Sequence, residues 1–191
     1  MAHILVVGGT GMLYDVCRHL CESVNTVTVI ARNKERLNRL VSDTKIMVGS
    51  INPLSLDYAD YEQLKDDLKK SIITNGPIEL AICWIHTSKA PEAAAIIAET
   101  IHKQNKHAKC KYYQFLSSAT ADPSHEKIDI SKNFNSFDNI DFRTILLGFV
   151  TEGETSRWLT DKEICSGVIE AIENDTRNSI IGTVEPWNKR P

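Results

Sequence analysis

The sequence predicts an α/β protein in which a mostly parallel β-sheet is covered by helices on both faces. Short apolar segments alternate along the 191-residue chain with segments whose apolar residues recur at helical spacing. Several apolar segments are nearly continuous, such as the one from Leu80 to Ile85, which is typical of strands buried on both faces. The first such segment runs directly into a glycine cluster. These observations predict a doubly wound sheet with its ligand crevice at the carboxyl ends of the strands.

The order of the elements gives the expected topology. Strands are expected over Ile4–Val7, Val27–Ala31, Lys45–Val48, Glu79–Ile85, Tyr112–Leu116, Phe142–Leu147 and Ser179–Thr183. Helices are expected over Met12–Cys21, Lys34–Val41, Tyr61–Ile72, Pro91–Gln104 and Asp161–Glu173, and the stretch Thr120–Asn139 is expected to be a loop with at most a short helix. This order predicts a single Rossmann-type domain over residues 1–191, with about seven strands in the order 3-2-1-4-5-6-7.

Two helix starts carry local signals. Thr160 is followed by Glu163 at the spacing of a capping box, in which each residue satisfies a backbone N–H of the other. Pro91 suits the first turn of its helix, where the missing N–H leaves no hydrogen bond unmade.

Composition and charge exclude several classes of function. The net charge is −3, from 22 basic and 25 acidic residues, and no basic run dominates, so a nucleic-acid partner is not expected. No apolar stretch approaches the roughly 20 residues that span a bilayer, and the N-terminal apolar segment ends at once in glycines. We therefore expect neither a membrane span nor a signal peptide, and a cytoplasmic protein.

The five cysteines, Cys17, Cys21, Cys83, Cys110 and Cys165, are odd in number and irregular in spacing, which does not indicate a disulfide framework. Cys17 and Cys21 lie four apart on an expected helix and could form a metal pair, but no other Cys or His supplies a matching second pair. We expect small buried side chains in a reducing compartment and no metal site.

The glycine cluster is the clearest functional signal in the chain. Glycines between a strand and a helix let backbone N–H groups approach a pyrophosphate, and the helix directs its positive end to the same point. Tyr14 stands where the third glycine of such a fingerprint would lie. A turn that is only structural is the alternative. The residues expected to hold a dinucleotide here are Gly8, Gly9, Thr10, Gly11, Met12 and Leu13.

The end of the second expected strand indicates which dinucleotide. An acid normally grips the ribose 2′-hydroxyl of NAD at this point, but the chain has Arg32, followed by Asn33 and Arg36. A guanidinium suits the 2′-phosphate of NADP. We therefore expect NADP rather than NAD, with Arg32, Asn33 and Arg36 as contacts. A solvated, basic start of the next helix is the alternative.

On these residues, and on Ser117-Ser118 at the end of the fifth expected strand, the chain resembles the short-chain dehydrogenase/reductase superfamily. The resemblance implies that Asp57 lies near the adenine, although a loop acid or helix cap explains it equally well. It also implies that the segment Leu147–Val150, with Gly148 and Val150, touches the nicotinamide, and that Ser118 is catalytic. A homodimer formed through the helix expected at Pro91–Gln104 is a further implication.

The chain departs from the family at its catalytic residues. No Tyr follows Tyr113, so the Tyr-x-x-x-Lys motif that should come after Ser118 is missing. The fourth strand ends in Cys83-Trp84-Ile85-His86 rather than the family's Asn-Asn-Ala-Gly. An imidazole can exchange a proton near neutral pH or hydrogen-bond a ribose, so His86 is a candidate for both catalysis and cofactor binding. A hydrogen-bonded loop histidine is the alternative. Trp84 either packs or stacks on a ring of the cofactor.

Two functions follow from these residues. The first is a divergent NADP-dependent oxidoreductase that acts on an unidentified small molecule, with His86, Ser118 or water supplying the proton. The second is a non-catalytic regulator that binds NADP(H) and senses its redox state. The missing tyrosine favours the regulator, and Gly148 after the sixth strand favours the enzyme.

Overall fold

The computed structural model describes residues 1–124 and 129–191 and confirms the predicted fold class. A sheet of seven parallel strands has the order β3-β2-β1-β4-β5-β6-β9. The seven are β1 (His3–Val7), β2 (Thr26–Ala31), β3 (Ser50–Ser55), β4 (Ile78–Cys83), β5 (Cys110–Ser117), β6 (Ile140–Leu147) and β9 (Asn178–Ile181). The strand order reverses between β1 and β4, and a doubly wound fold binds its ligand at the carboxyl ends of such a pair.

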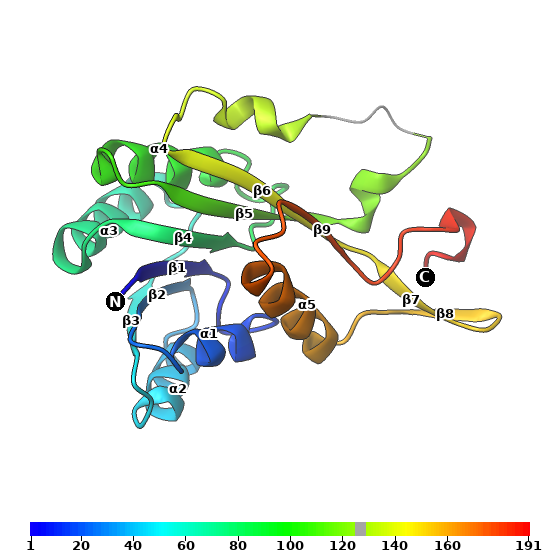
Figure 1. Ribbon diagram of the computed structural model, residues 1–191, viewed down its shortest axis with the longest axis horizontal. Helices are drawn as coiled ribbons and strands as arrows, with labels where there is room; N and C mark the ends of the chain where they lie inside the picture. The colour runs from blue at the N-terminus through cyan, green and yellow to red at the C-terminus, as the bar shows by residue number, and fades with distance from the viewer. Residues whose placement is uncertain (125–128) are drawn as a thin grey trace.

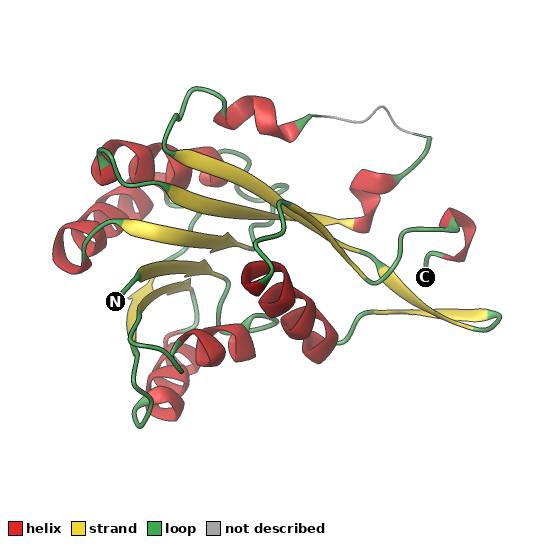
Figure 2. Cartoon of the chain, in the orientation of Figure 1, coloured by secondary structure: helices red, strands yellow, loops and turns green. Residues whose placement is uncertain are grey.

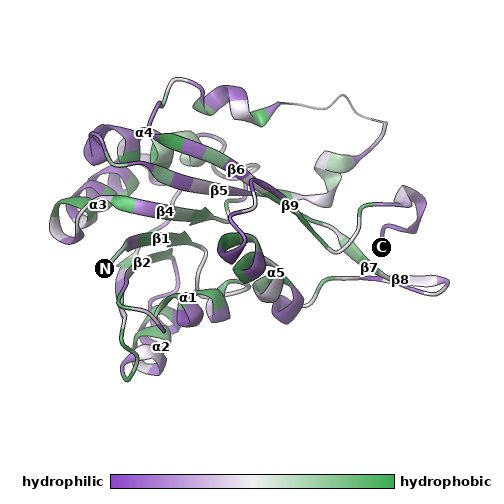
Figure 3. Ribbon diagram, viewed as in Figure 1, coloured by the Kyte–Doolittle hydropathy of each residue, from purple (hydrophilic) through white to green (hydrophobic). Residues whose placement is uncertain are grey.

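Within the described residues, five α-helices cover the two faces of this sheet (Figure 1). Helices α1 (Tyr14–Leu20), α2 (Lys34–Thr44) and α5 (Asp161–Glu173) lie on one face, and α3 (Tyr61–Asn75) and α4 (Ala93–Asn105) lie on the other. Side chains of a strand alternate between faces, so Val6 packs in one apolar cluster and its neighbours Leu5 and Val7 pack in the other. Figure 3 shows that β1 and β6 are largely apolar, whereas β5 and the helices carry both apolar and polar residues.

The third strand is not where the sequence pattern placed it. The apolar run Lys45–Val48 was expected to form it, but this run is a surface turn in which Ile46 is 95% and Val48 68% exposed. The strand is Ser50–Ser55, in which Pro53 pairs with Val29 of β2. An edge strand tolerates proline and needs few apolar residues, so its sequence signal is weak.

The helix ends agree with the expectations with small shifts. Helix α5 covers Asp161–Glu173 as predicted, and both hydrogen bonds of the Thr160–Glu163 capping box are present. Helix α1 begins at Tyr14 rather than Met12, and α4 begins at Ala93, two residues after Pro91. No helix within residues 1–124 and 129–191 is both long and apolar enough to cross a membrane.

All five cysteines are free and buried, as expected. Burial raises the pKa of the Cys21 thiol to about 11 and that of Cys83 to about 12. Thiols of this kind are inert, because the thiolate is the reactive form. In the described part of the chain, no three His, Cys, Asp or Glu side chains gather as metal ligands would.

The described residues contain a further hairpin and short 3₁₀ helices besides the main sheet and its helices (Figure 2). The strands β7 (Phe149–Glu152) and β8 (Thr155–Trp158) form an antiparallel hairpin that the sequence pattern did not reveal. Along the chain, two 3₁₀ helices connect β5 to β6 within the stretch expected to be loop, namely η1 (Ser118–Ala121) and η2 (Ile130–Phe134). A third, η3 (Trp187–Lys189), precedes the C-terminal residues. Residues 125–128 of that expected loop lie outside the described chain.

Candidate functional site

The glycines of the first turn have three different roles. Gly8 has a φ of +84°, which favours glycine, and its N–H donates to the carbonyl oxygen of Ile30 at 2.9 Å. A Cβ on Gly9 would lie 2.6 Å from Sγ of Cys17, so Gly9 allows α1 to pack closely on the sheet. A Cβ on Gly11 would have no atom within 4 Å. Gly8 and Gly9 therefore serve the fold, and Gly11 leaves open space.

That space belongs to a cavity of about 390 Å³. It brings together three residues expected from the sequence, Thr10, Gly11 and Arg36. It also contains Arg39, which the sequence reasoning missed, although Arg39 follows Arg36 at helical spacing on α2. Two guanidinium groups, which suit phosphate, lie beside the open glycine turn, and one carboxylate, that of Asp161, also lines the recess. The complete lining is Thr10, Gly11, Tyr14, Arg36, Arg39 and Asp161.

Tyr14, at the position of the third glycine, links α1 to α2. Its hydroxyl donates a hydrogen bond to the Asp43 carboxylate, and Nε of Arg39 lies 3.8 Å from the same carboxylate. Burial and the neighbouring Asp43 raise the pKa of the Tyr14 hydroxyl. The tyrosine therefore forms one wall of the recess and stays in its neutral, hydrogen-bonding form.

The residues expected to contact the adenosine end also gather at this edge. Nη1 of Arg32, after β2, lies 3.5 Å from Oδ2 of Asp57, which follows β3. Both side chains are exposed, Arg32 at 59% and Asp57 at 46%. Asn33 instead caps α2, because its Oδ1 accepts a hydrogen bond from the Arg36 backbone N–H at 2.9 Å.

His86 does not lie at a strand end. Strand β4 was expected to reach Ile85 but ends at Cys83, which places His86 in the following loop. Its side chain is exposed, and its backbone N–H donates to the Tyr58 hydroxyl at 3.3 Å. Trp84 packs edge-on against both His86 and Phe115, with ring centroids 5.5 and 5.6 Å apart. The Trp84 ring therefore packs against protein side chains.

Ser118 lies in a different cavity from His86. Ser118 is only 3% exposed and lines a cavity of about 220 Å³ together with Gly148 and Arg190. His86 lines a neighbouring cavity of about 420 Å³ on the side of α4. Trp84 lines both cavities. The two candidate catalytic side chains therefore do not face one common space.

The remaining expected contacts are mainly structural. A Cβ on Gly148 would lie 2.1 Å from the carbonyl oxygen of Thr183, so glycine is required there by close backbone packing. Leu13 is fully buried, and the Met12 carbonyl oxygen accepts a hydrogen bond from Sγ of Cys165 at 2.9 Å. Met12 and Leu13 thus fix the turn, while Gly148 still borders the Ser118 cavity.

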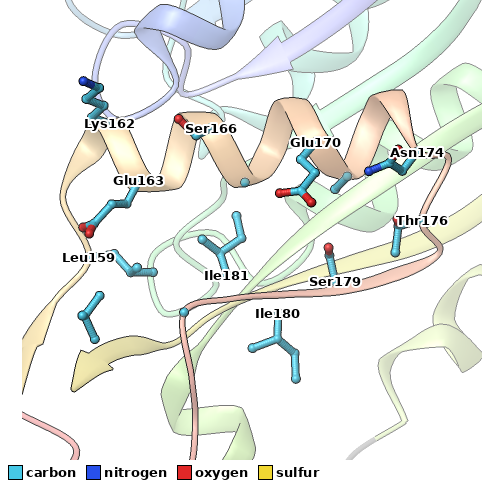
Figure 4. Close-up of a pocket in the computed structure, with 14 residues that line it drawn as sticks. Leu159, Lys162, Glu163, Ser166, Glu170, Asn174, Thr176, Ser179, Ile180 and Ile181 are labelled. Carbon is cyan, nitrogen blue, oxygen red and sulfur yellow. The ribbon is translucent and has the colours of Figure 1, made fainter. Parts of the chain in front are cut away.

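Val150 lies apart from Gly148. It lines a cavity of about 530 Å³ between α5 and β9, shown in Figure 4. Of the expected cofactor contacts, Val150 is the one that this cavity contains. The cavity's size alone therefore does not make it the dinucleotide site.

Sequence reasoning missed Arg190 near the C-terminus. Its Nε donates a hydrogen bond to Oγ of Ser118 at 2.8 Å, and its guanidinium carbon lies 4.9 Å from the ring centroid of Trp158 and 5.2 Å from that of Trp187. The aromatic residue Trp187, three positions before Arg190, is the available sequence signal. The guanidinium of Arg190 therefore places a positive charge at the Ser118 cavity.

Solved structures share this architecture. A short-chain dehydrogenase from Oenococcus oeni aligns with a TM-score of 0.75 at 9% identity, covering 99% of this chain and 97% of that one. A ketone-specific alcohol dehydrogenase from Comamonas testosteroni gives 0.72 at 11% identity, covering 98% and 90%. An alcohol dehydrogenase from Thermococcus sibiricus gives 0.71 at 13% identity, covering 96% of each chain.

Searches of protein-family models and of curated proteins find no match. The structural likeness nevertheless extends over almost the whole length of each aligned chain. At such low identity the likeness concerns the fold, and the expected resemblance is confirmed at that level. The chain shares its fold with these short-chain and alcohol dehydrogenases.

Proposed function

We propose that the protein is an oxidoreductase that uses NADP(H) to transfer hydride to or from a small molecule. The recess beside the glycine turn carries this proposal, because the open Gly11 and the guanidinium groups of Arg36 and Arg39 meet there. Such an arrangement fits the phosphates of a dinucleotide. Among the described residues, Arg36 has no carboxylate within 4.0 Å, so its charge is open to an anionic ligand.

The choice of NADP rests on the adenosine end. Arg32 replaces the acid that would accept the 2′-hydroxyl of NAD, and Arg36 and Arg39 add positive charge nearby. Proteins of the same fold provide context. The Thermococcus enzyme was solved with 5-hydroxy-NADP and a Sphingobium yanoikuyae dehydrogenase with NADPH, whereas a Haemophilus oxidoreductase was solved with NAD. Arg32, Arg36 and Arg39 of this chain favour a cofactor of the NADP type, as in the first two of these structures.

Ser118 is the side chain best placed to hold a substrate oxygen. The cofactor, when bound, would supply or accept the hydride. The Ser118 hydroxyl accepts a hydrogen bond from Nε of Arg190, so its own proton is available to a substrate carbonyl oxygen. The adjacent guanidinium favours the negative charge that develops on that oxygen. The proton would come from water, since no Tyr follows Tyr113 and His86 lines a different cavity.

The test combines binding and turnover. We expect NADPH to bind the wild-type protein and an Arg36→Gln/Arg39→Gln variant to bind it about 10- to 100-fold more weakly, as expected for charge-assisted hydrogen bonds. Arg18→Gln on α1 is the control, because it also removes an exposed arginine that is paired with an acid. NADPH oxidation is then followed with a panel of aldehydes, ketones and 2-oxo acids. Equal affinity in all three proteins would remove the basis of the proposal.

A non-catalytic NADP(H)-binding regulator is the second candidate. One observation favours it, the missing tyrosine. Tight NADPH binding without hydride exchange to any member of the panel would support the regulator over the enzyme.

A further inference from the structure

Arg190 is held in a defined position at the mouth of the Ser118 cavity. Its guanidinium lies over the rings of Trp158 and Trp187, and its Nε donates to Ser118. The preceding residue, Lys189, is fixed as well, since its carbonyl oxygen accepts a hydrogen bond from the Ser156 hydroxyl and its Nζ donates to the Gly153 carbonyl oxygen at 3.0 Å. The tail thus lies along the β7–β8 hairpin (Figure 1). Arg190 is therefore a placed group rather than a loose end.

Among the residues that the structure describes, no carboxylate lies within 4.0 Å of the Arg190 guanidinium. Most arginines of the chain lie within 4.0 Å of a carboxylate, namely Arg18, Arg32, Arg39, Arg143, Arg157 and Arg177. Within residues 1–124 and 129–191, Arg36 and Arg190 are the two without one, and each lines a cavity. Arg36 faces the recess at the glycine turn. Arg190 faces the cavity of Ser118 and Gly148.

We infer that Arg190 binds a carboxylate of the substrate, so that the substrate class is a small 2-oxo or 2-hydroxy acid. The two tryptophan rings fix the plane of the guanidinium, and its Nη atoms remain available for the paired hydrogen bonds that a carboxylate accepts. Ser118 would hold the neighbouring oxygen of the same molecule. A cavity of about 220 Å³ suits a ligand of this size. The assignment of this anion as a substrate rests on the proposed oxidoreductase function.

A phosphate of the cofactor is the competing ligand for the same chemistry. The recess at the glycine turn and the cavity at Ser118 share no lining residue, and the recess already has its own pair of arginines. The geometry therefore favours separate anion sites for cofactor and substrate. If Arg190 belonged to the cofactor site, NADPH and a small carboxylate would exclude one another.

The test uses DL-lactate and its neutral isostere DL-lactamide as probes, titrated by NMR into the full-length protein with and without NADPH. We expect lactate to bind at least about tenfold more tightly than lactamide, and to bind the NADPH complex as well. Arg190→Gln should reduce the preference to within about twofold. Arg190→Lys should retain part of it, because the charge remains. Arg18→Gln, the matched control, should retain all of it. The near-UV circular dichroism spectrum, to which Trp158 and Trp187 contribute together with Trp84, checks that the tail stays in place.

The outcomes separate this inference from the proposed function. Equal binding of lactate and lactamide, or an unchanged preference in a correctly folded Arg190→Gln variant, would overturn the carboxylate site. Exclusion of lactate by NADPH would assign Arg190 to the cofactor and overturn the substrate class. A retained lactate preference in a protein that does not bind NADPH would leave the anion site in place and reject the oxidoreductase.

Discussion

The Arg32 guanidinium and the Asp57 carboxylate lie 3.5 Å apart, at the carboxyl ends of the neighbouring strands β2 and β3. Arg32 was expected to bind the 2′-phosphate of NADP, and Asp57 was expected to lie near the adenine. Because both side chains are largely exposed, the ion pair itself is worth at most about 1 kcal/mol. A phosphate can therefore compete for Arg32.

This pair gives the first prediction. Arg32→Ala should reduce the preference for NADPH over NADH by about 1.5–3 kcal/mol, the usual contribution of a charge-assisted hydrogen bond. Asp57→Asn should increase the preference, because it removes the competing carboxylate. Calorimetric titration of both cofactors measures the change. Equal affinity of the wild-type protein for NADPH and NADH would rule out the assigned role of Arg32.

The second prediction separates two glycines of the same turn. Gly11→Val should abolish NADPH binding with a melting temperature near the native one, because its side chain enters open space. Gly9→Ala should lower the free energy of unfolding by about 1–3 kcal/mol, because the new Cβ would lie 2.6 Å from Sγ of Cys17. Thermal unfolding and cofactor titration are measured on both variants. Unchanged cofactor affinity in Gly11→Val would show that the turn is only structural.

The third prediction concerns the two candidate catalytic side chains. Ser118 shares its cavity with Gly148, whereas His86 lies beyond Trp84 in the neighbouring cavity. Ser118→Ala should therefore lower kcat by about 10²-fold or more, and His86→Gln should lower it less. Both variants should bind NADPH like the wild type. A larger loss in His86→Gln would mean that the reaction takes place on the α4 side of the sheet.

The fourth prediction concerns the pH dependence of stability. His3 is buried, with Nδ1 2.7 Å from the Gly76 carbonyl oxygen and Nε2 2.8 Å from the Thr28 hydroxyl, and burial lowers its pKa below the usual 6.5. The unfolded chain then binds the proton more readily than the folded one, so stability is complete above about pH 6.5 and is lost as the pH falls.

Urea unfolding between pH 8 and pH 5.5 measures this loss. His3→Gln should reduce the pH dependence over that range, whereas His107→Gln, which changes an exposed histidine, should not. The same slope in all three proteins would show that His3 does not contribute to the pH dependence.

The sequence predicted the parts of the fold that depend on strong local patterns. The apolar strands of the sheet other than β3 lie close to their expected positions, with β4 ending at Cys83 instead of Ile85, and the Thr160–Glu163 capping box is present as expected. The third strand was misplaced because an edge strand with Pro53 has little apolar signal, while Ile46 and Val48 mimic one in a surface turn. The hairpin β7–β8 was missed because its strands are short and largely exposed.

The candidate site was only partly predictable for a different reason. Thr10 and Gly11 lie in the turn after the first predicted strand, and Arg36 lies at the start of the helix after the second. Because these two strands were expected to be neighbours, the three residues could be expected to line one recess. Arg190 reaches Ser118 from 72 residues away in the chain, through the packing of the tail on the hairpin. No local pattern encodes such a contact.

A crystal structure of the protein with NADPH tests the central claim most directly. It should show the pyrophosphate at Gly11, the 2′-phosphate within hydrogen-bonding distance of Arg32, Arg36 or Arg39, and the nicotinamide beside Ser118 and Gly148. Density for NADPH elsewhere, for example in the cavity between α5 and β9, or an empty glycine turn at saturating NADPH, would contradict it.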